Sequence, residues 1–297
     1  MKRFVAGIGE LLWDLLPGGR EIGGAPANFA WHVHALGMTG LIVSSVGDDE
    51  DGREILERLR GLGLQRDHVS VDRVRPTGRS TVSLDLSGVP SFRVHENAAW
   101  DFIPFAPSLA RVAGEIEAVN FGTLGQRSPA SKETTLSFLS RTRPGAIRLF
   151  DLNLRPPHFT REVIEESLGL ATAVKLNDSE LSVVSEMLGF AGDERDRVRR
   201  IADVYDLDLA ALTRGEKGSV LYSRERWSVH TGYKTRVVDT VGAGDAFAAA
   251  LVAGMLARLD LDLVNDRANR VASFVCSRPG ATPELPADLR RLFTGES

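Results

Sequence analysis

Residues 147–188 read IRLFDLNLRPPHFTREVIEESLGLATAVKLNDSELSVVSEML, and two hydrophobic patterns alternate along them. The apolar runs at 147–151 and 173–176 have the length of buried strands, and the stretches at 161–168 and 178–188 repeat apolar residues at helical spacing. Alternation of strand and helix predicts a mostly parallel sheet with helices on both faces. This stretch therefore predicts an α/β fold.

The same alternation extends over the rest of the chain, without an internal repeat, a low-complexity tract or a domain linker. A chain of 297 residues has the length of one or two domains, and we expect one domain over 1–297. Further strands are expected at 4–8, 41–46, 118–121, 209–213 and 219–222. Further helices are expected at 49–59, 132–140, 244–258 and 263–276, so that two helices end the chain.

One stretch departs from this alternation and predicts a β-hairpin at Thr81–Val94, with a turn at Ser87–Pro90. Because a hairpin fits poorly into a fully covered parallel sheet, we expect it to form a small separate sheet with residues 10–20. This lid is discontinuous in sequence, over about 10–22 and 72–103, and is expected to cover a site. Its exposed strand edges invite pairing between subunits, which would give a homodimer.

The composition excludes several partners. The 36 basic and 40 acidic residues give a formal charge of -4, whereas nucleic-acid-binding domains usually carry a basic surplus. The single cysteine, Cys276, cannot form an intrachain disulfide or a zinc site built on several cysteines, and it favours a reducing cytoplasm. The apolar run at 4–8 is too short for a signal peptide, and Ala246–Leu256 is shorter than the about 20 residues of a membrane helix. We expect a cytoplasmic protein that binds neither nucleic acid nor membrane.

The strongest chemical signal is DTVGAGDAF at Asp239–Phe247, which leads into the long apolar helix. Gly242 and Gly244 let the backbone turn tightly and place no Cβ in the way of a ligand. The free N–H groups at the helix start then form an anion site. Asp245 lies in the first helical turn, where a carboxylate is useful if it takes a proton while the anion is transferred. Alternatively, Asp245 is an ordinary N-terminal carboxylate that stabilises the helix dipole.

This helix start and four other motifs, all in the same order, resemble the ribokinase family, also called PfkB-type carbohydrate kinases. The other four are GGAPAN at 23–28, DLNLR at 151–155, KLNDSE at 175–180 and TRGEKG at 213–218. With GELLWD at 9–14 added, the sequence is most similar to bacterial fructokinase-like members, and the resemblance spans essentially the whole chain. It implies a three-layer α/β/α ribokinase-like core with a small β-sheet lid.

The resemblance implies that the residues around Gly-Ala-Gly-Asp transfer a phosphoryl group. Asp245 matches the base that takes the proton from the sugar hydroxyl, and a weak base suffices if the proton leaves late. The backbone N–H groups of Gly242, Ala243 and Gly244 are expected to hold the γ-phosphoryl oxygens as an anion hole. Arg155 is expected to reach the transferred phosphate, unless it is an exposed surface arginine.

Three positions match family residues that hold sugar hydroxyls, namely Asp14, Gly24 and Asn28. A carboxylate and an amide accept and donate hydrogen bonds, which suits a neutral polyol. The alternatives are that Asp14 is solvated at a strand end and that Asn28 caps a helix. Trp100 is expected to supply an apolar wall against the sugar ring, or else to be a core tryptophan.

Lys175, Asn177 and Glu180 are expected near the phosphates of ATP. Asn177 and Glu180 resemble an Asn-x-x-Glu element that organises Mg²⁺ and phosphate through water, and a capping box at a helix start is compatible with that role. The Lys175 side chain alternatively points away from the phosphates. Asp239 and the loop at 275–284 resemble a site for a monovalent cation such as K⁺, where backbone oxygens would supply most ligands.

A nucleotide loop is expected between two strands, at Thr213, Gly215 and Gly218. The alternative is a plain glycine turn of a hairpin. Asn269 and Ser273, on the last expected helix, are predicted to edge the adenine pocket.

Together, these observations predict an ATP- and Mg²⁺-dependent kinase for a free ketohexose such as fructose. The Ala25-Pro26 spelling within the 23–28 motif favours fructose, and the lid lacks the cation cluster that a second phosphate on the sugar would require. Two alternatives stay open. The substrate is another sugar, a nucleoside or a sugar phosphate, or the protein is a non-catalytic sugar or nucleotide sensor on the same fold. The intact Asp245 and its neighbouring glycines argue against the sensor.

Overall fold

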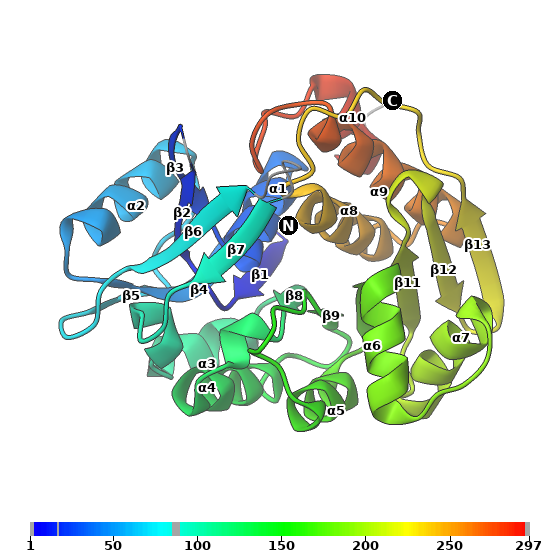
Figure 1. Cartoon of the computed structure of the whole chain (residues 1–297), viewed down its shortest axis with the longest axis horizontal. Coiled ribbons are helices and arrows are strands. Elements are labelled where there is room, and N and C mark those ends of the chain that lie inside the picture. The colour runs from blue at the N-terminus through cyan, green and yellow to red at the C-terminus, as the bar shows by residue number, and fades with distance from the viewer. Residues whose placement is uncertain (1–2, 17, 85–89, 295–297) are drawn as a thin grey trace.

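The computed structural model describes residues 3–16, 18–84 and 90–294, and its largest feature is one central sheet (Figure 1). The strands of this sheet are β1 (Phe4–Ile8), β4 (Thr39–Gly47), β5 (Val69–Asp72), β8 (Ala118–Phe121), β9 (Ile147–Asp151), β10 (Ala173–Asn177), β11 (Leu209–Thr213), β12 (Ser219–Ser223) and β13 (Arg226–His230). Within the described residues they follow the order β13-β12-β11-β10-β9-β8-β1-β4-β5. Neighbours are parallel except at β12 and β13, which confirms the mostly parallel sheet expected from the sequence.

Helices cover both faces of the central sheet, as the alternation predicts (Figure 1). One face packs against α1, α8 and α9 around Phe29 and Phe247, and the other packs against α3 to α7 around the stacked rings of Phe121 and Phe150. The α8 helix is apolar on all sides because it is buried, which explains the long apolar run. The helices are α1 (Ala25–Ala35), α2 (Glu50–Gly61), α3 (Pro107–Ala113), α4 (Pro129–Leu139), α5 (Arg161–Leu170), α6 (Asp178–Leu188), α7 (Glu194–Val204), α8 (Ala243–Leu256), α9 (Leu261–Cys276) and α10 (Ala287–Thr294).

A second, smaller sheet stands beside the central one and confirms the expected separate sheet. Its strands are β2 (Leu12–Leu16), β3 (Gly19–Gly23), β6 (Gly78–Leu84) and β7 (Pro90–Val94), in the order β3-β2-β6-β7. The β6 and β7 strands are the expected antiparallel hairpin, and β2 pairs with β6 in parallel. Of the turn expected at Ser87–Pro90, residues 87–89 lie outside the described residues.

Two of the helices that the hydrophobic patterns of the sequence did not predict are α7 and α10. The α7 helix reads ERDRVRRIADV, and its buried side consists only of Val198, Ile201 and Ala202. The α10 helix follows α9 and corrects the expectation that two helices end the chain. It is short, and Leu289 is the buried residue by which it packs on the core. Such narrow apolar stripes give a weak periodic signal. None of the helices in the described part of the chain is long and apolar enough to cross a membrane.

Close backbone contacts set the start of α1 against the central sheet. A Cβ at Gly7 would lie 2.2 Å from the Pro26 carbonyl oxygen, and a Cβ at Gly24 would lie 2.3 Å from the Glu10 carbonyl oxygen. Gly24 also has a φ of 110°, a backbone conformation that favours glycine. The N-terminus of α1 therefore lies directly over the carboxyl end of β1, which is where open α/β sheets bind their ligands.

Candidate active site

A cavity of about 370 Å³ opens between the carboxyl ends of the central strands and the second sheet. It contains most of the residues singled out from the sequence, although they are scattered over the chain. The predicted residues that line it are Asp14, Gly24, Asn28, Arg155, Lys175, Asn177, Glu180, Thr213, Gly242, Gly244 and Asp245. Convergence of several polar groups in one cavity is what a binding or catalytic site requires.

Asp245 is positioned by the left-handed turn that starts α8. Gly242 is the N-cap of this helix, with a φ of 75°, and a Cβ there would lie 2.4 Å from the Ala281 carbonyl oxygen. Asp245 follows in the first turn, and its Oδ2 accepts a hydrogen bond of 2.9 Å from Nδ2 of Asn28. Burial raises the pKa of Asp245, while Asn28 and Lys175 lower it. The carboxylate therefore points into the cavity with its position fixed by an amide.

Asn28 does not cap a helix, contrary to one interpretation of the sequence. Gly24 is the N-cap of α1, and Asn28 lies one turn further along. The backbone N–H of Asn28 donates to the Gly24 carbonyl within the helix, at 3.0 Å, so its side chain is left for Asp245.

Lys175 and Asp151 form a buried ion pair beneath the start of α8. Nζ of Lys175 lies 2.9 and 3.1 Å from the two carboxylate oxygens of Asp151. A Cβ on Gly244 would lie 3.1 Å from the same Nζ. Burial raises the pKa of Asp151 well above its usual range, and the ammonium of Lys175 lowers it. Lys175 therefore points toward the anion site and not away from it.

Glu180 acts as a cap and also lines the cavity. Asn177 Oδ1 accepts from the Glu180 backbone N–H at 2.9 Å, and Glu180 Oε2 accepts from the Asn177 backbone N–H at 2.8 Å. This reciprocal pair confirms the capping box. Glu180 Oε1 accepts from the Leu154 backbone N–H at 2.9 Å. Each carboxylate oxygen has a second lone pair, and Glu180 lines the cavity, which suits contact with a metal ion through water.

The second sheet contributes Asp14 and Ser80, which are direct cross-strand partners on β2 and β6. Asp14 is not a solvated strand end, because it is half-buried in the middle of β2 and lines the cavity. Burial raises its pKa to about 6, while Ser80 and Arg155 lower it. A Cβ at Gly23 would lie 2.0 Å from Asp14 Oδ2, so glycine leaves the space that this carboxylate occupies. Ser80 was not predicted from the sequence. The one signal for it was its position in the alternating strand β6, two residues after Gly78.

Glu10 is a second residue that sequence reasoning missed, although it stands in the GELLWD motif. It follows β1, is 4% exposed and lines the cavity. Its Oε1 accepts from the Ala25 backbone N–H at 3.2 Å, and thereby supplies the acceptor that the N-cap Gly24 lacks. Burial raises the pKa of Glu10 to about 7.

Two predicted roles are corrected by the structure. Trp100 is 0% exposed and is packed with Ala98 and Leu124, so it supports the cavity wall from behind and does not line it. The core alternative for Trp100 is therefore the correct one. The backbone N–H of Ala243 donates to the Thr240 carbonyl at 3.3 Å, which leaves Gly242 and Gly244 as the cavity-lining part of the expected anion hole.

Of the remaining nucleotide-binding candidates, Thr213 alone is among the residues that line this cavity. Thr213 lines it, whereas Gly215 and Gly218 form the turn between β11 and β12. A Cβ at Gly218 would lie 2.1 Å from the His230 carbonyl oxygen, so close packing of the turn accounts for that glycine. Asn269 is 7% exposed and its Nδ2 donates to Ser219 Oγ at 2.6 Å, which is a core contact between α9 and β12. The adenine-edge role predicted for Asn269 and Ser273 is thus not supported by the cavity.

Asp239 ties two loops together next to the start of α8. Its Oδ1 accepts from the Val241 backbone N–H at 3.0 Å, and its Oδ2 accepts from the Gly280 backbone N–H at 3.1 Å. The first contact closes the 239–241 turn, and the second holds that loop against the 275–284 loop. A cation at this place stays a prediction, since its expected ligands are backbone oxygens.

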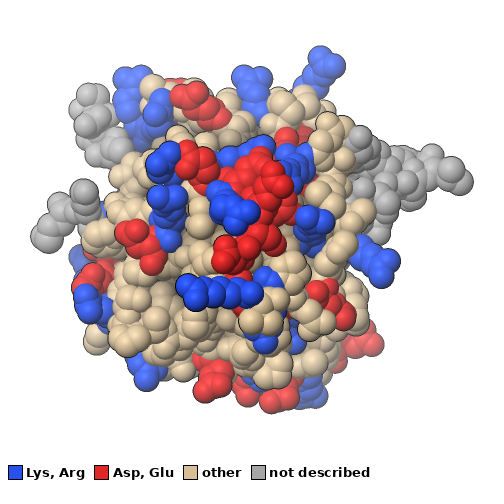
Figure 2. Space-filling model, turned by 90° about the vertical axis from the view of Figure 1, so that its left-hand side faces the viewer, with Lys and Arg blue, Asp and Glu red and all other residues tan. Residues whose placement is uncertain are grey.

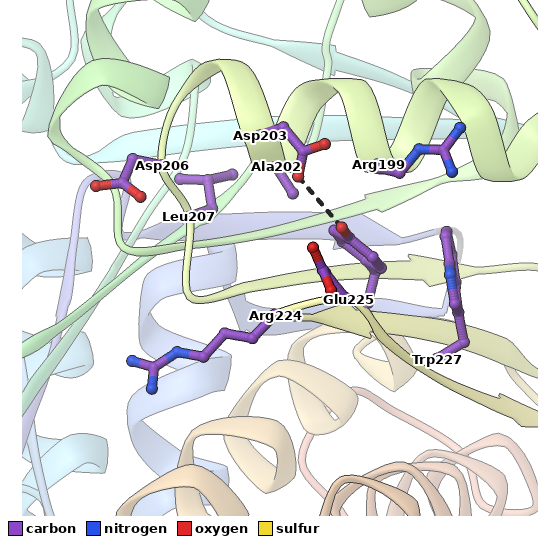
Figure 3. A pocket seen from close by; sticks show the side chains of 9 residues that line it. Arg199, Ala202, Asp203, Asp206, Leu207, Arg224, Glu225 and Trp227 are labelled. Atoms are coloured by element: carbon purple, nitrogen blue, oxygen red, sulfur yellow. Dashed lines mark hydrogen bonds between the residues drawn. The ribbon is translucent and has the colours of Figure 1, made fainter.

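A second cavity, of about 480 Å³, lies far from this chemistry, between α7 and the β12–β13 turn (Figure 3). Tyr222 donates a hydrogen bond of 3.2 Å to Asp203, and the carboxylates of Asp206 and Glu225 lie nearby. None of the residues predicted from the sequence lines it. The predicted polar residues that line the cavity around Asp245, and not its volume, therefore identify it as the candidate active site.

Comparison with known proteins agrees with this geometry. The model of the family described as pfkB family carbohydrate kinase matches residues 18–288. A protein of Pyrococcus horikoshii named as a sugar kinase is 30% identical over 297 residues, covering 93% of this chain and 91% of that protein. A fructokinase of Salmonella typhimurium is 27% identical over 305 residues, covering 96% of this chain and 98% of that protein.

Among solved structures, an uncharacterized sugar kinase from Pyrococcus horikoshii in complex with ATP matches with a TM-score of 0.82 and 29% identity. The match covers 97% of this chain and 99% of that one. The ribokinase-like fold and the order of the motifs lead to the same assignment. The chain belongs to the pfkB family of carbohydrate kinases and is an ATP-dependent carbohydrate kinase.

Proposed function

We propose that this kinase transfers the γ-phosphoryl group of ATP to a hydroxyl group of a free ketohexose, and that fructose is the preferred substrate. The observation that carries the proposal is the Asn28–Asp245 hydrogen bond, which places a carboxylate between the start of α8 and the polar residues of the second sheet. A base in that position faces both an anion site and a neutral polyol site.

The transfer step rests on positioning and on charge stabilisation. Asp245 accepts the proton of the attacking hydroxyl late in the reaction, when that hydroxyl has become acidic. The backbone at Gly242 and Gly244 and the ammonium of Lys175 stabilise charge on the γ-phosphoryl oxygens. Arg155 lines the same cavity, and we infer that it contacts the phosphoryl group.

Mg²⁺ fits this site through Asn177 and Glu180, because both residues line the cavity and each Glu180 oxygen has a second lone pair after capping α6. A divalent ion bound there would neutralise charge on the phosphate groups. The two residues would hold it through water molecules, and their own task is to orient that hydration shell.

The second sheet favours a neutral sugar over a sugar phosphate. Its described cavity-lining residues are Leu12, Asp14, Ser80 and Val94. Arg79 and Asp51 pair at 2.7 Å on the opposite side of this sheet, toward α2. Acidic and basic side chains lie next to one another on that outer face (Figure 2). Because the described lid residues bring no cation into the cavity, a second phosphate on the sugar would lack a partner there.

The named relatives support a hexose substrate. The Salmonella typhimurium protein and one from Solanum tuberosum are both named fructokinase. Their matches cover 96% and 97% of this chain, at 27% and 26% identity. A nucleoside kinase of Burkholderia thailandensis shares the fold at 23% identity, which carries no substrate argument.

The decisive experiment is an ADP-release assay over a panel of acceptors under one set of conditions. The panel contains fructose, ribose, adenosine, 2-keto-3-deoxygluconate and fructose 1-phosphate. A mismatched hydroxyl leaves a buried polar group unpaired at about 1–3 kcal/mol, so fructose should exceed ribose in kcat/KM by about tenfold or more. If ribose or adenosine wins by that margin, the fructose assignment fails and the kinase assignment stands. If no acceptor releases ADP, the sensor alternative gains support.

A further inference from the structure

Three polar side chains form a row across the central sheet directly beneath the active site. Asn120 on β8, Asp151 on β9 and Lys175 on β10 share one face, because Asn120 aligns with Leu149, two residues before Asp151, and Asp151 aligns with Lys175. Glu10 follows β1, the strand on the other side of β8. Apolar neighbours on this sheet face, Ala118, Leu149, Ala173 and Leu209, belong to the buried core under α1 and α8.

A small cavity lies between these groups. Its lining includes Glu10, Asn120 and Asp151, and apolar atoms of Pro26 and Phe121 close it. Its volume is about 10 Å³, which is the size that holds one water molecule. Glu10, Ala25, Leu124 and Asn153 line both this cavity and the active-site cavity, so the two adjoin each other.

Asn120 supplies an independent sign of a bound molecule. It is 2% exposed, and its Oδ1 has no hydrogen-bond partner among the described residues. Buried carbonyl groups are almost always paired with protein or with ordered water, since an unpaired one is costly. The cavity is polar and has room for one water molecule. Such a water molecule would supply the hydrogen-bond donor that Asn120 Oδ1 lacks.

The charges around the cavity match such a molecule. Glu10 faces Asp245 and Arg155, besides the Ala25 N–H that its carboxyl group accepts. Asp151 faces Lys175, Asp245 and Glu180. A water molecule can donate one hydrogen bond to Asn120 and a second to a carboxylate, and it can accept one from a protonated carboxyl group. Each of these partners is present in the lining.

We propose that this cavity binds one ordered water molecule that joins Asn120 to the carboxyl groups of Glu10 and Asp151. Asn120 is thus a positioning residue, which acts through the water on the electrostatic environment of Asp245. The water site rests on the geometry alone. Its effect on turnover rests on the proposed role of Asp245 as the base.

The first test is a high-resolution crystal structure of the wild-type protein without substrate. We expect one ordered water within hydrogen-bond distance of Asn120 Oδ1 and of both carboxyl groups. In Asn120→Leu, a branched apolar side chain fills the same space, and we expect the water to be absent. A wild-type cavity that holds no water overturns the proposal, whether or not the variant folds and whichever acceptor the kinase uses.

The second test is the pH profile of kcat/KM for the acceptor that the panel identifies. Water that donates to Glu10 stabilises its charged form, so losing the water raises the pKa of Glu10 further. A neutral Glu10 repels the Asp245 carboxylate less, so the pKa of the proposed base falls, and we expect the acid limb of the Asn120→Leu profile to move down by about one pH unit. Phe121→Leu is the matched control, because it loosens the same cavity and keeps Asn120, and its acid limb should stay in place. Superposed profiles for wild type and Asn120→Leu would overturn the coupling.

Discussion

The two halves of the active site are built in different ways. Asp245, Lys175 and Asp151 stand on the central sheet and on a helix start, and they are held by hydrogen bonds to one another or to Asn28. Asp14 stands on the second sheet, where pairing with β6 and the docking of that sheet on α2 fix its place. We therefore propose that the phosphoryl-transfer groups lie on a rigid part of the molecule and that the sugar-selecting groups lie on a part that adjusts to the substrate.

Replacing the proposed base, Asp245, should cause the largest loss of activity, because Asp245 lies on the rigid part of the site. Asp245→Asn keeps the shape of the side chain and its place beside Asn28, but it removes the proton acceptor. We expect kcat to fall by about 10²–10⁴-fold, with KM for ATP and for sugar nearly unchanged. Steady-state kinetics and calorimetric binding of ATP measure the two effects separately. A variant with near-normal turnover contradicts the assignment of the base.

The anion site should be the next most sensitive feature. Gly244→Val brings a branched side chain against Lys175 Nζ, which a Cβ would already approach to 3.1 Å. Because the close neighbour is the end of a flexible side chain, the fold should survive, while the phosphates lose their approach. We expect kcat/KM for ATP to fall by about 10²-fold or more. Thermal unfolding gives the control, and a folded variant that keeps its ATP turnover would show that phosphate does not bind there.

A substitution in the proposed sugar-binding residues of the second sheet should change KM for sugar and not kcat. In Asp14→Asn we expect KM for sugar to rise by about tenfold to a hundredfold, with KM for ATP unchanged, because one buried acceptor is lost. The contrast with Asp245→Asn separates the two halves of the site. Equal losses in both parameters for both substrates would mean that Asp14 supports the fold instead of the sugar.

Asp14 also predicts a pH dependence of sugar binding. Burial raises the pKa of Asp14 to about 6, so its carboxylate is present above that pH and is protonated below it. A protonated carboxyl group accepts fewer hydrogen bonds, and KM for sugar in the wild-type protein should therefore rise as the pH falls through about 6. Asp14→Asn carries no titrating group at that position and should give a flat KM over the same range.

The sequence predicts the rigid half of the site better than the adjustable half. Lys175 lies in a buried strand, and Gly244 and Asp245 begin an apolar helix. The carboxyl ends of parallel strands meet at one edge of the sheet. Local pattern therefore determines both the element and the location of the side chain.

Residues that depend on long-range packing were not predictable in this way. Trp100 has the side chain of a sugar-stacking residue, but only the packing of Ala98 and Leu124 around it shows that it is buried. Ser80 and Glu10 are ordinary residue types whose importance depends on the register of β2 with β6 and on the fit of α1 over β1. Asn269 lies on the expected helix, yet its amide is used by Ser219.

The smallest expected effect concerns the docking of the second sheet on α2. Asp51 is 7% exposed and bonds Arg79 on β6 at 2.8 Å and also Arg20 on β3. Asp51→Asn keeps the shape of the side chain and removes the charge that both guanidinium groups share. We expect a stability loss of about 1 kcal/mol and a rise in KM for sugar of about twofold to fivefold, since Asp14 then loses part of its support.

Hydrogen exchange with and without sugar measures the same effect locally. In the wild-type protein, sugar should protect 78–84 and 90–94, because the sheet closes over the bound substrate. In Asp51→Asn that protection should shrink, while exchange in β9 and β10 stays unchanged. Glu57→Gln is the matched control: it breaks an exposed ion pair with Arg60 on the same helix, and it should alter neither KM nor exchange. If Asp51→Asn behaves like this control, α2 does not hold the second sheet in place. The contrast between the central sheet and the second sheet must then rest on strand pairing alone.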